Sequence, residues 1–128
     1  MRPLLVAAIL AAMSTATGVM AAASSYTFEP VKAELQKGDD VTVAVRIVEK
    51  SSKKPVPDAV IVRTRIDMGP DGMPTMEAPL APARSSEPGA YSFKTSLPMA
   101  GHWLLSIAAK VQGEPETVVG KVTYTVIP

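Results

Sequence analysis

The sequence predicts an all-β protein, an immunoglobulin-like antiparallel β-sandwich of about seven strands preceded by an N-terminal signal segment. Three observations support this fold class. Apolar and polar residues alternate along most of the chain after residue 24, as they do in strands with one buried face. The alternating runs are short, and turn signals such as Gly38-Asp39 and Pro88-Gly89 separate them. Helical periodicity is hard to find in the same region.

The expected strands follow from this alternation. In the clearest of them, every second residue from Val41 to Ile47 is aliphatic. Trp103 is the only tryptophan and is the expected centre of the core. One expected inward face is shared by Val60, Val62, Thr64, Ile66 and Met68. In chain order, the expected strands are residues 26–35, 41–47, 60–68, 80–84, 91–97, 103–111 and 118–126.

Residues 1–23 have the composition of a signal peptide. Arg2 supplies the positive charge, residues 4–12 form a short apolar region, and the alanines at 21–23 precede the expected cleavage site before Ser24. Cleavage would leave residues 24–128 as one periplasmic or otherwise exported domain. An uncleaved membrane anchor is the alternative, because residues 4–23 are about long enough to cross a bilayer, although serine, threonine and glycine residues interrupt them.

The composition of residues 24–128 argues against several classes of protein. The region has no cysteine, so neither disulfides nor thiolate ligands are available. Without Arg2, 12 basic residues balance 12 acidic ones, and the basic patch of a nucleic-acid-binding protein is missing. With one histidine, no phosphate-binding glycine loop and no zinc-ligand spacing, we expect no enzymatic activity.

Methionines are concentrated in one short stretch. Residues 68–76 read MGPDGMPTM, and the density of glycine and proline predicts a loop. A further methionine and the only histidine follow at Met99 and His102, between two later strands. Thioether sulfur is a soft, neutral donor that suits Cu(I) and needs no deprotonation. If the fold brings the two segments to the same end, a Cu(I) site is expected from Met68, Met73, Met76, Met99 and His102.

Each of these residues also has an interpretation without metal. Met68 continues the inward face of its strand, which favours a core role. For the other three methionines, the residues alone support ligand and packing roles equally. A lone histidine is more often a surface or hydrogen-bonded residue than a ligand. Asp67 and Asp71 would add oxygen donors and favour Cu(II), but aspartates in turns usually cap backbone amides.

Several motifs resemble the YtkA-like domain, which is related to the FixH family. They are Pro57-Asp58-Ala59-Val60, Met73-Pro74-x-Met76, Gly89-x-Tyr91 and Leu97-x-Met99-x-Gly101-x-Trp103. The resemblance covers roughly residues 40–126 and implies a small exported or membrane-anchored β-sandwich, similar in shape to periplasmic copper-binding sandwiches of the CopC type. It implies a place in copper efflux or oxidase assembly. It also puts Met73, Met76 and Met99 on the family's methionine positions, whereas His102 lies between the family's glycine and tryptophan.

Two functions of different classes are therefore expected. The first is a periplasmic copper-handling protein that buffers Cu(I) or delivers it to a heavy-metal efflux or oxidase-assembly membrane protein. The second is a non-enzymatic interaction module whose methionine-rich loops dock a membrane-protein partner without metal. A third interpretation is a purely structural exported domain whose methionines cap the end of the sandwich.

Overall fold

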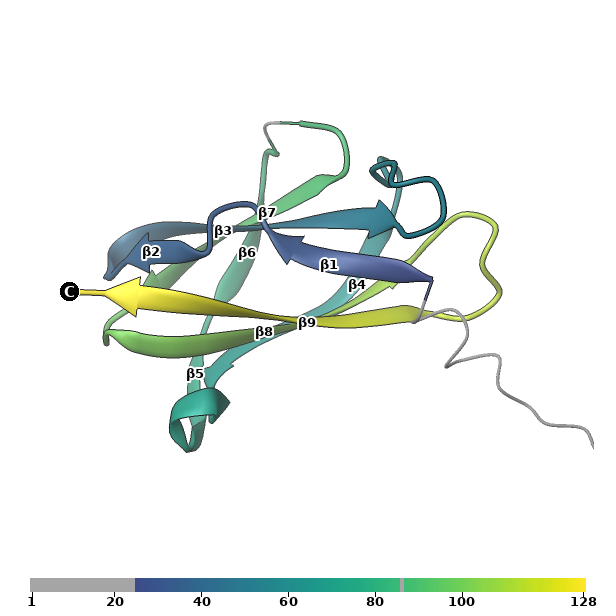
Figure 1. The fold of residues 1–128 in the computed structure, drawn as a ribbon. Coiled ribbons are helices and arrows are strands. Elements are labelled where there is room, and N and C mark those ends of the chain that lie inside the picture. The colour runs from purple at the N-terminus through teal and green to yellow at the C-terminus, as the bar shows by residue number, and fades with distance from the viewer. Residues whose placement is uncertain (1–24, 86) are drawn as a thin grey trace, which may run out of the picture.

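The structure is a computed structural model that describes residues 25–85 and 87–128. It confirms the all-β prediction: two sheets pack face to face as a sandwich (Figure 1). The elements described are β1 Tyr26–Pro30, β2 Glu34–Gln36, β3 Gly38–Glu49, β4 Val60–Met68, the 3₁₀ helix η1 Gly69–Asp71, β5 Met73–Ala78, β6 Leu80–Ala83, β7 Ala90–Leu97, β8 Gly101–Lys110 and β9 Val118–Ile127. The expected signal segment, residues 1–23, lies outside these residues. None of the described helical structure is long and apolar enough to cross a membrane.

The strands form one sheet of four and one of five. The smaller sheet has the order β1-β3-β7-β6, and the larger has the order β2-β9-β8-β4-β5. Neighbouring strands are antiparallel except for β2 and β9, which are parallel. The open edges on one side of the sandwich are therefore β6 in one sheet and β4 with β5 in the other.

The segment predicted as one first strand, residues 26–35, forms two strands in different sheets. β1 pairs with β3 and ends at Pro30, which has no N–H to continue a ladder. Residues 31–33 then cross to the larger sheet, where the N–H of Thr125 donates to the Ala33 carbonyl at 2.9 Å and Leu35 pairs with Val126. This crossover ties the two sheets together.

The inward faces of both sheets meet in a core centred as predicted on Trp103. Its side chain is fully buried, and so is that of Tyr124 on the neighbouring strand. The Tyr124 hydroxyl donates a 2.6 Å hydrogen bond to the Ala44 carbonyl of the opposite sheet. Because burial raises the pKa of Tyr124, this hydroxyl stays protonated and remains a donor. A second cluster that includes Tyr26 and Ile47 extends the core toward one end.

The expected inward face of β4 is wrong for the first half of the strand. Val60 and Val62 are 61% and 48% exposed. The pairing of β4 with β8 shifts by one residue after Ile61, which marks a β-bulge at Val62. The extra residue reverses the alternation, so Ile61 packs against the core while Ile66 and Met68 are buried as predicted.

β5 is a strand where the sequence predicts a loop. Met73 pairs with Met68, and Ala78 pairs with Ile66, although the register shifts between these pairs and leaves residues 74–76 without partners on β4. β5 thus covers only the last three residues of β4. The first half of β4 has a neighbouring strand on one side only.

Candidate functional site

The two methionine-bearing segments lie at the same end of the sandwich. β4 ends in η1, and Gly72 closes that turn with a left-handed φ of 80° and an N–H that donates to the Gly69 carbonyl at 2.9 Å. The turn presents Asp71 to the beginning of β8. There the Asp71 carboxylate accepts from the His102 backbone N–H at 2.7 Å and contacts His102 Nδ1 at 2.9 Å. Residues 68–76 and 98–102 are called the methionine end below.

Gly101 allows these segments to approach so closely. Its φ is +143°, in the region that favours glycine. A Cβ at this position would lie 2.5 Å from both an Asp71 carboxylate oxygen and the terminal methyl carbon of Met68. The glycine of the Met99-x-Gly101-x-Trp103 motif therefore has a steric role, because any side chain would separate the two segments.

Trp103 anchors the Met99 segment to the core. Its indole N–H donates to the Met99 carbonyl at 3.0 Å, while the ring is fully buried. A buried indole N–H without a partner is unfavourable by about 1–3 kcal/mol. This hydrogen bond consequently favours one backbone position for Met99.

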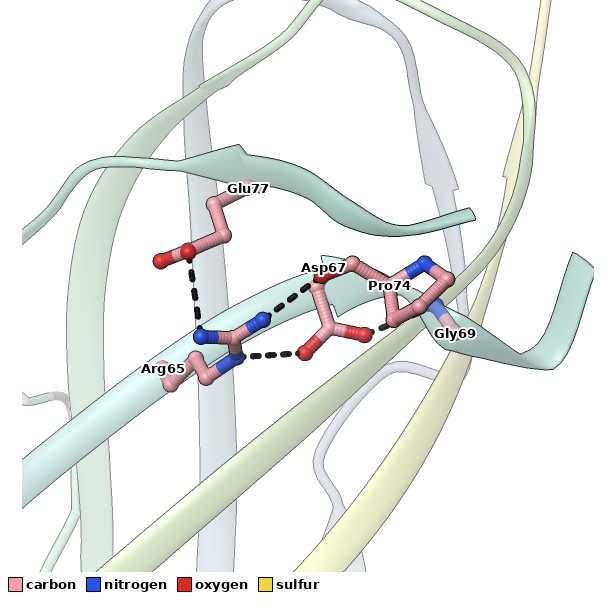
Figure 2. A network of polar contacts seen from close by, with 5 residues as sticks. All are labelled: Arg65, Asp67, Gly69, Pro74 and Glu77. Carbon is pink, nitrogen blue, oxygen red and sulfur yellow. Dashed lines mark hydrogen bonds and ion pairs between the residues drawn. The ribbon is translucent and has the colours of Figure 1, made fainter. Parts of the chain in front are cut away.

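A polar network fixes the other segment (Figure 2). The buried Asp67 carboxylate accepts from Arg65 Nε at 2.7 Å and from the Gly69 N–H at 2.7 Å. The same guanidinium donates to the Pro74 carbonyl at 2.6 Å and pairs with Glu77 at 3.0 Å. One arginine on β4 thus holds both the beginning of η1 and the beginning of β5. The sequence analysis did not predict this role of Arg65.

Both aspartates of this region are committed to hydrogen bonds and remain ionised at neutral pH. Burial alone would raise the pKa of Asp67, but hydrogen bonds from Arg65 and the Gly69 N–H, with the charges of Arg65 and Lys121, lower it overall. The pKa of Asp71 is lowered first by the His102 backbone N–H and then by the His102 ring. Asp67 therefore caps a turn, as aspartates commonly do.

The ionised Asp71 also determines which histidine nitrogen is available. A carboxylate can only accept, so the Nδ1 that faces it carries a proton. In the neutral ring, Nε2 then holds the lone pair, and the side chain is 53% exposed. Carboxylates commonly orient metal-binding histidines in this way. The sequence indicated Asp71 as a turn residue or oxygen donor, and its contact with a residue 31 positions away was not evident.

The four methionines of residues 24–128 all belong to this end, but they differ in exposure. Met68 is 1% exposed and lies in the core, as one interpretation of the sequence predicted. Met76 is half-buried and packs against that core. Met73 and Met99 are 37% and 38% exposed. The solvent-accessible donors are therefore the two outer thioethers and the imidazole of His102.

Ligand sets built from nitrogen and oxygen are not found in the described part of the chain. No three histidine, aspartate or glutamate side chains within it are grouped so that they could hold a metal ion. The arrangement at the methionine end fits a soft ion with thioether ligands better than it fits Zn²⁺, Mg²⁺ or Ca²⁺.

Comparison with known families agrees with the resemblance indicated by the sequence motifs. The sequence profile of YtkA-like proteins matches residues 20–108, well over half of the chain. The chain belongs to the YtkA-like family. The match begins earlier than the motifs alone indicated and ends within β8, so β9 lies outside it. The relation of this YtkA-like domain to FixH stays a prediction.

Distant structural likenesses were also found for this YtkA-like domain. The Lin-41 filamin domain is 14% identical, with a TM-score of 0.45 and coverage of 77% of this chain and 93% of its own. The ZirS C-terminal domain is 10% identical, with a TM-score of 0.43 and coverage of 97% of this chain and 86% of its own. No curated protein sequence matches the chain.

Replacing Asp67 with Asn should lower the free energy of unfolding by about 1–3 kcal/mol, because an uncharged amide cannot pair with Arg65 and accepts less strongly from the Gly69 N–H. The pKa of Asp67 is lower in the folded state, so its stabilising effect is complete above the ordinary value of 3.8 and is lost as the pH falls through the folded pKa. In urea unfolding experiments, the wild type should therefore lose more free energy of unfolding than the variant as the pH is lowered below about 4.

The matched control is Glu77→Gln, which removes the other carboxylate that pairs with Arg65. Glu77 is 52% exposed, so this change should alter stability by no more than about 0.5 kcal/mol. Equal losses in the two variants would contradict the role assigned to Asp67.

Proposed function

We propose that this YtkA-like domain is an exported, non-enzymatic copper-handling protein that binds Cu(I) at the methionine end. The observation that carries the proposal is the Asp71–His102 contact, which brings residues 68–76 and 98–102 together. Every methionine of residues 24–128 then lies at one end of the sandwich. A packing role alone would not require the partial exposure of Met73 and Met99.

Met73, Met99 and His102 Nε2 are the donors that an incoming ion would meet first. The two thioethers are partly exposed, and the imidazole is held by Asp71 with Nε2 away from that contact. Met76 and Met68 are the inner candidates. Met68 is buried, with its methyl group beside Gly101. In this proposal the outer donors capture the ion, and the inner sulfurs add to the site only after local movement.

The donor chemistry favours Cu(I) over harder ions. Thioethers are uncharged and polarisable, and they need not lose a proton to bind. They also cannot be consumed as disulfides in an oxidising compartment, which suits a chain without cysteine. The expected role is to buffer Cu(I) or to transfer it to an efflux or oxidase-assembly membrane protein in the periplasm.

Anaerobic Cu(I) titration against a competing chelator tests the site. Replacing Met73 or Met99 with Leu keeps the volume and the apolar character but removes a sulfur, and each change should weaken binding by more than about tenfold. Met76→Leu should have a smaller effect because that side chain is half-buried. Val119→Leu, at an exposed apolar position near the other end of β9, is the control and should leave the affinity unchanged.

Two results would contradict the assignment. One is an affinity that survives replacement of Met73 and Met76 together by Leu. The other is binding of Zn²⁺ as tight as that of Cu(I), which thioether donors do not support.

A double-mutant cycle tests the role of His102. Asp71→Asn removes the charge that fixes the proton on Nδ1, so Cu(I) affinity should fall by about 10–100-fold, as for other residues that orient metal ligands. In the His102→Ala background, the same Asp71 change should have little further effect, because the ring that it orients is absent. Additive losses from the two changes would indicate that Asp71 acts on the loop and not on the histidine.

A second candidate function is favoured by the exposure of Met73 and Met99. Flexible thioether side chains on a surface can adapt to an apolar partner. The domain would then dock a membrane protein through the methionine end without metal. A co-purified efflux or oxidase-assembly protein should be retained equally with and without a Cu(I) chelator in this case. Loss of the partner on chelation would favour the copper function instead.

A further inference from the structure

A second surface lies along the first half of β4, away from the methionine end. A groove of about 720 Å³ runs between the two sheets on their open side. Residues 61–64 of β4 form one wall, residues 82–83 of β6 form part of the other, and residues 90–93 of β7 lie at its base. Such a volume is in the range of protein ligand sites.

The β4 side of this groove is an unpaired strand edge. Residues 60–65 pair with β8 on one side, whereas β5 reaches only Ile66, Asp67 and Met68 on the other. In an antiparallel pair, alternate residues direct their N–H and C=O groups away from the neighbouring strand, and here the bulge at Val62 interrupts that alternation once. Along residues 60–65 these groups meet no other backbone of the described chain. An edge of this kind is a template for another strand.

The opposite edge is less suited to accept a strand. β6 has only four residues, and Pro82 among them has no N–H to donate. The β4 edge carries two exposed β-branched residues, Val60 and Val62, which are favourable in strands and provide apolar contact for a partner. The unpaired backbone groups and the exposed apolar side chains therefore lie on the same strand, β4.

The charges of the groove favour an acidic occupant. Glu87 is its only acidic lining residue, and its carboxylate is paired with Arg46 at 2.6 Å. Arg63 also lines the groove, and within the described residues its guanidinium has neither a hydrogen bond nor an ion pair. Because Glu87 is already paired, the Arg63 guanidinium is the unpaired charge among the described residues that line this largely apolar groove.

We propose that residues 60–65 of β4 bind an extended segment of a partner protein as an added strand. Its backbone pairs with the free edge of β4. Its alternate aliphatic side chains enter the groove, and an acidic side chain pairs with Arg63. An anionic amphiphile would match the apolar groove and the cation but would leave the strand edge unpaired, so the peptide accounts for more of the surface.

The test uses residues 24–128 without metal and a capped eight-residue peptide that alternates valine with serine and threonine and has one central glutamate. Two-dimensional ¹H–¹⁵N NMR follows the peptide titration and amide hydrogen exchange. At saturation, exchange should slow by about tenfold or more at the amides of residues 60–65 that point away from β8, whose alternation is interrupted by the bulge at Val62. The methionine end should be unaffected, which separates this result from the copper proposal.

Charge exchange tests the role of Arg63. Arg63→Glu should weaken peptide binding by about 3–10-fold, and a peptide with lysine in place of glutamate should regain the loss. Lys32→Glu makes the same change of charge at an exposed residue outside the groove and should have little effect.

Two N-methylated peptides test the added strand without altering the protein. Methyl groups on the amides that face β4 should abolish binding, whereas methyl groups on the other set should leave it intact. The proposal is overturned if both methylated peptides bind equally, if Arg63→Glu has no effect, or if the amides of residues 60–65 do not respond. The proposal is also overturned if decanoate binds in the groove and the peptide does not bind, because the groove would then accept amphiphiles instead of a strand.

Discussion

The hydrogen bond from the Trp103 indole to the Met99 carbonyl connects the core to the candidate site. Trp103 is fully buried among core residues of both sheets. Its N–H must find an acceptor inside the protein, and the segment that supplies one carries Met99. The backbone position of the partly exposed Met99 thus depends on how Trp103 packs in the core. A loosened core would loosen this end as well.

The methionine end combines a hydrogen-bonded backbone with partly exposed thioether side chains. Asp67, Arg65 and Asp71 hold residues 68–76 through charge-assisted hydrogen bonds, which are stronger than those between neutral groups. The partly exposed thioether chains of Met73 and Met99 have several rotatable bonds. In the proposed copper function, this arrangement would let the outer thioethers reorient around an ion while the backbone keeps its hydrogen bonds.

The fold was largely predictable because alternation depends on neighbouring residues. Trp103 and the inward residues of β3 and β8 are buried as expected. Val60 and Val62 were misplaced because a bulge arises from pairing with β8, which local alternation does not reveal. The loop assignment of Met73 failed for a similar reason, since β5 forms through its pairing with β4. The role of the methionines and of His102 as ligands stays a prediction. The contact between Asp71 and His102 could not be predicted, because it depends on how distant strands are arranged.

β1 begins at the end of the sandwich opposite the methionine end, which determines where a tether on its N-terminal side would join the domain. Tyr26 begins β1 beside Glu49 and bonds to Glu114, both at the end remote from His102 (Figure 1). Whatever precedes Tyr26 therefore joins roughly 30 Å from the methionines, about the length of the ten residues of β8. Pro128, by contrast, follows the strand that pairs with Gly101. A tether at the N-terminal side would leave the methionine end facing outward, and a fusion at the C-terminal side would crowd it.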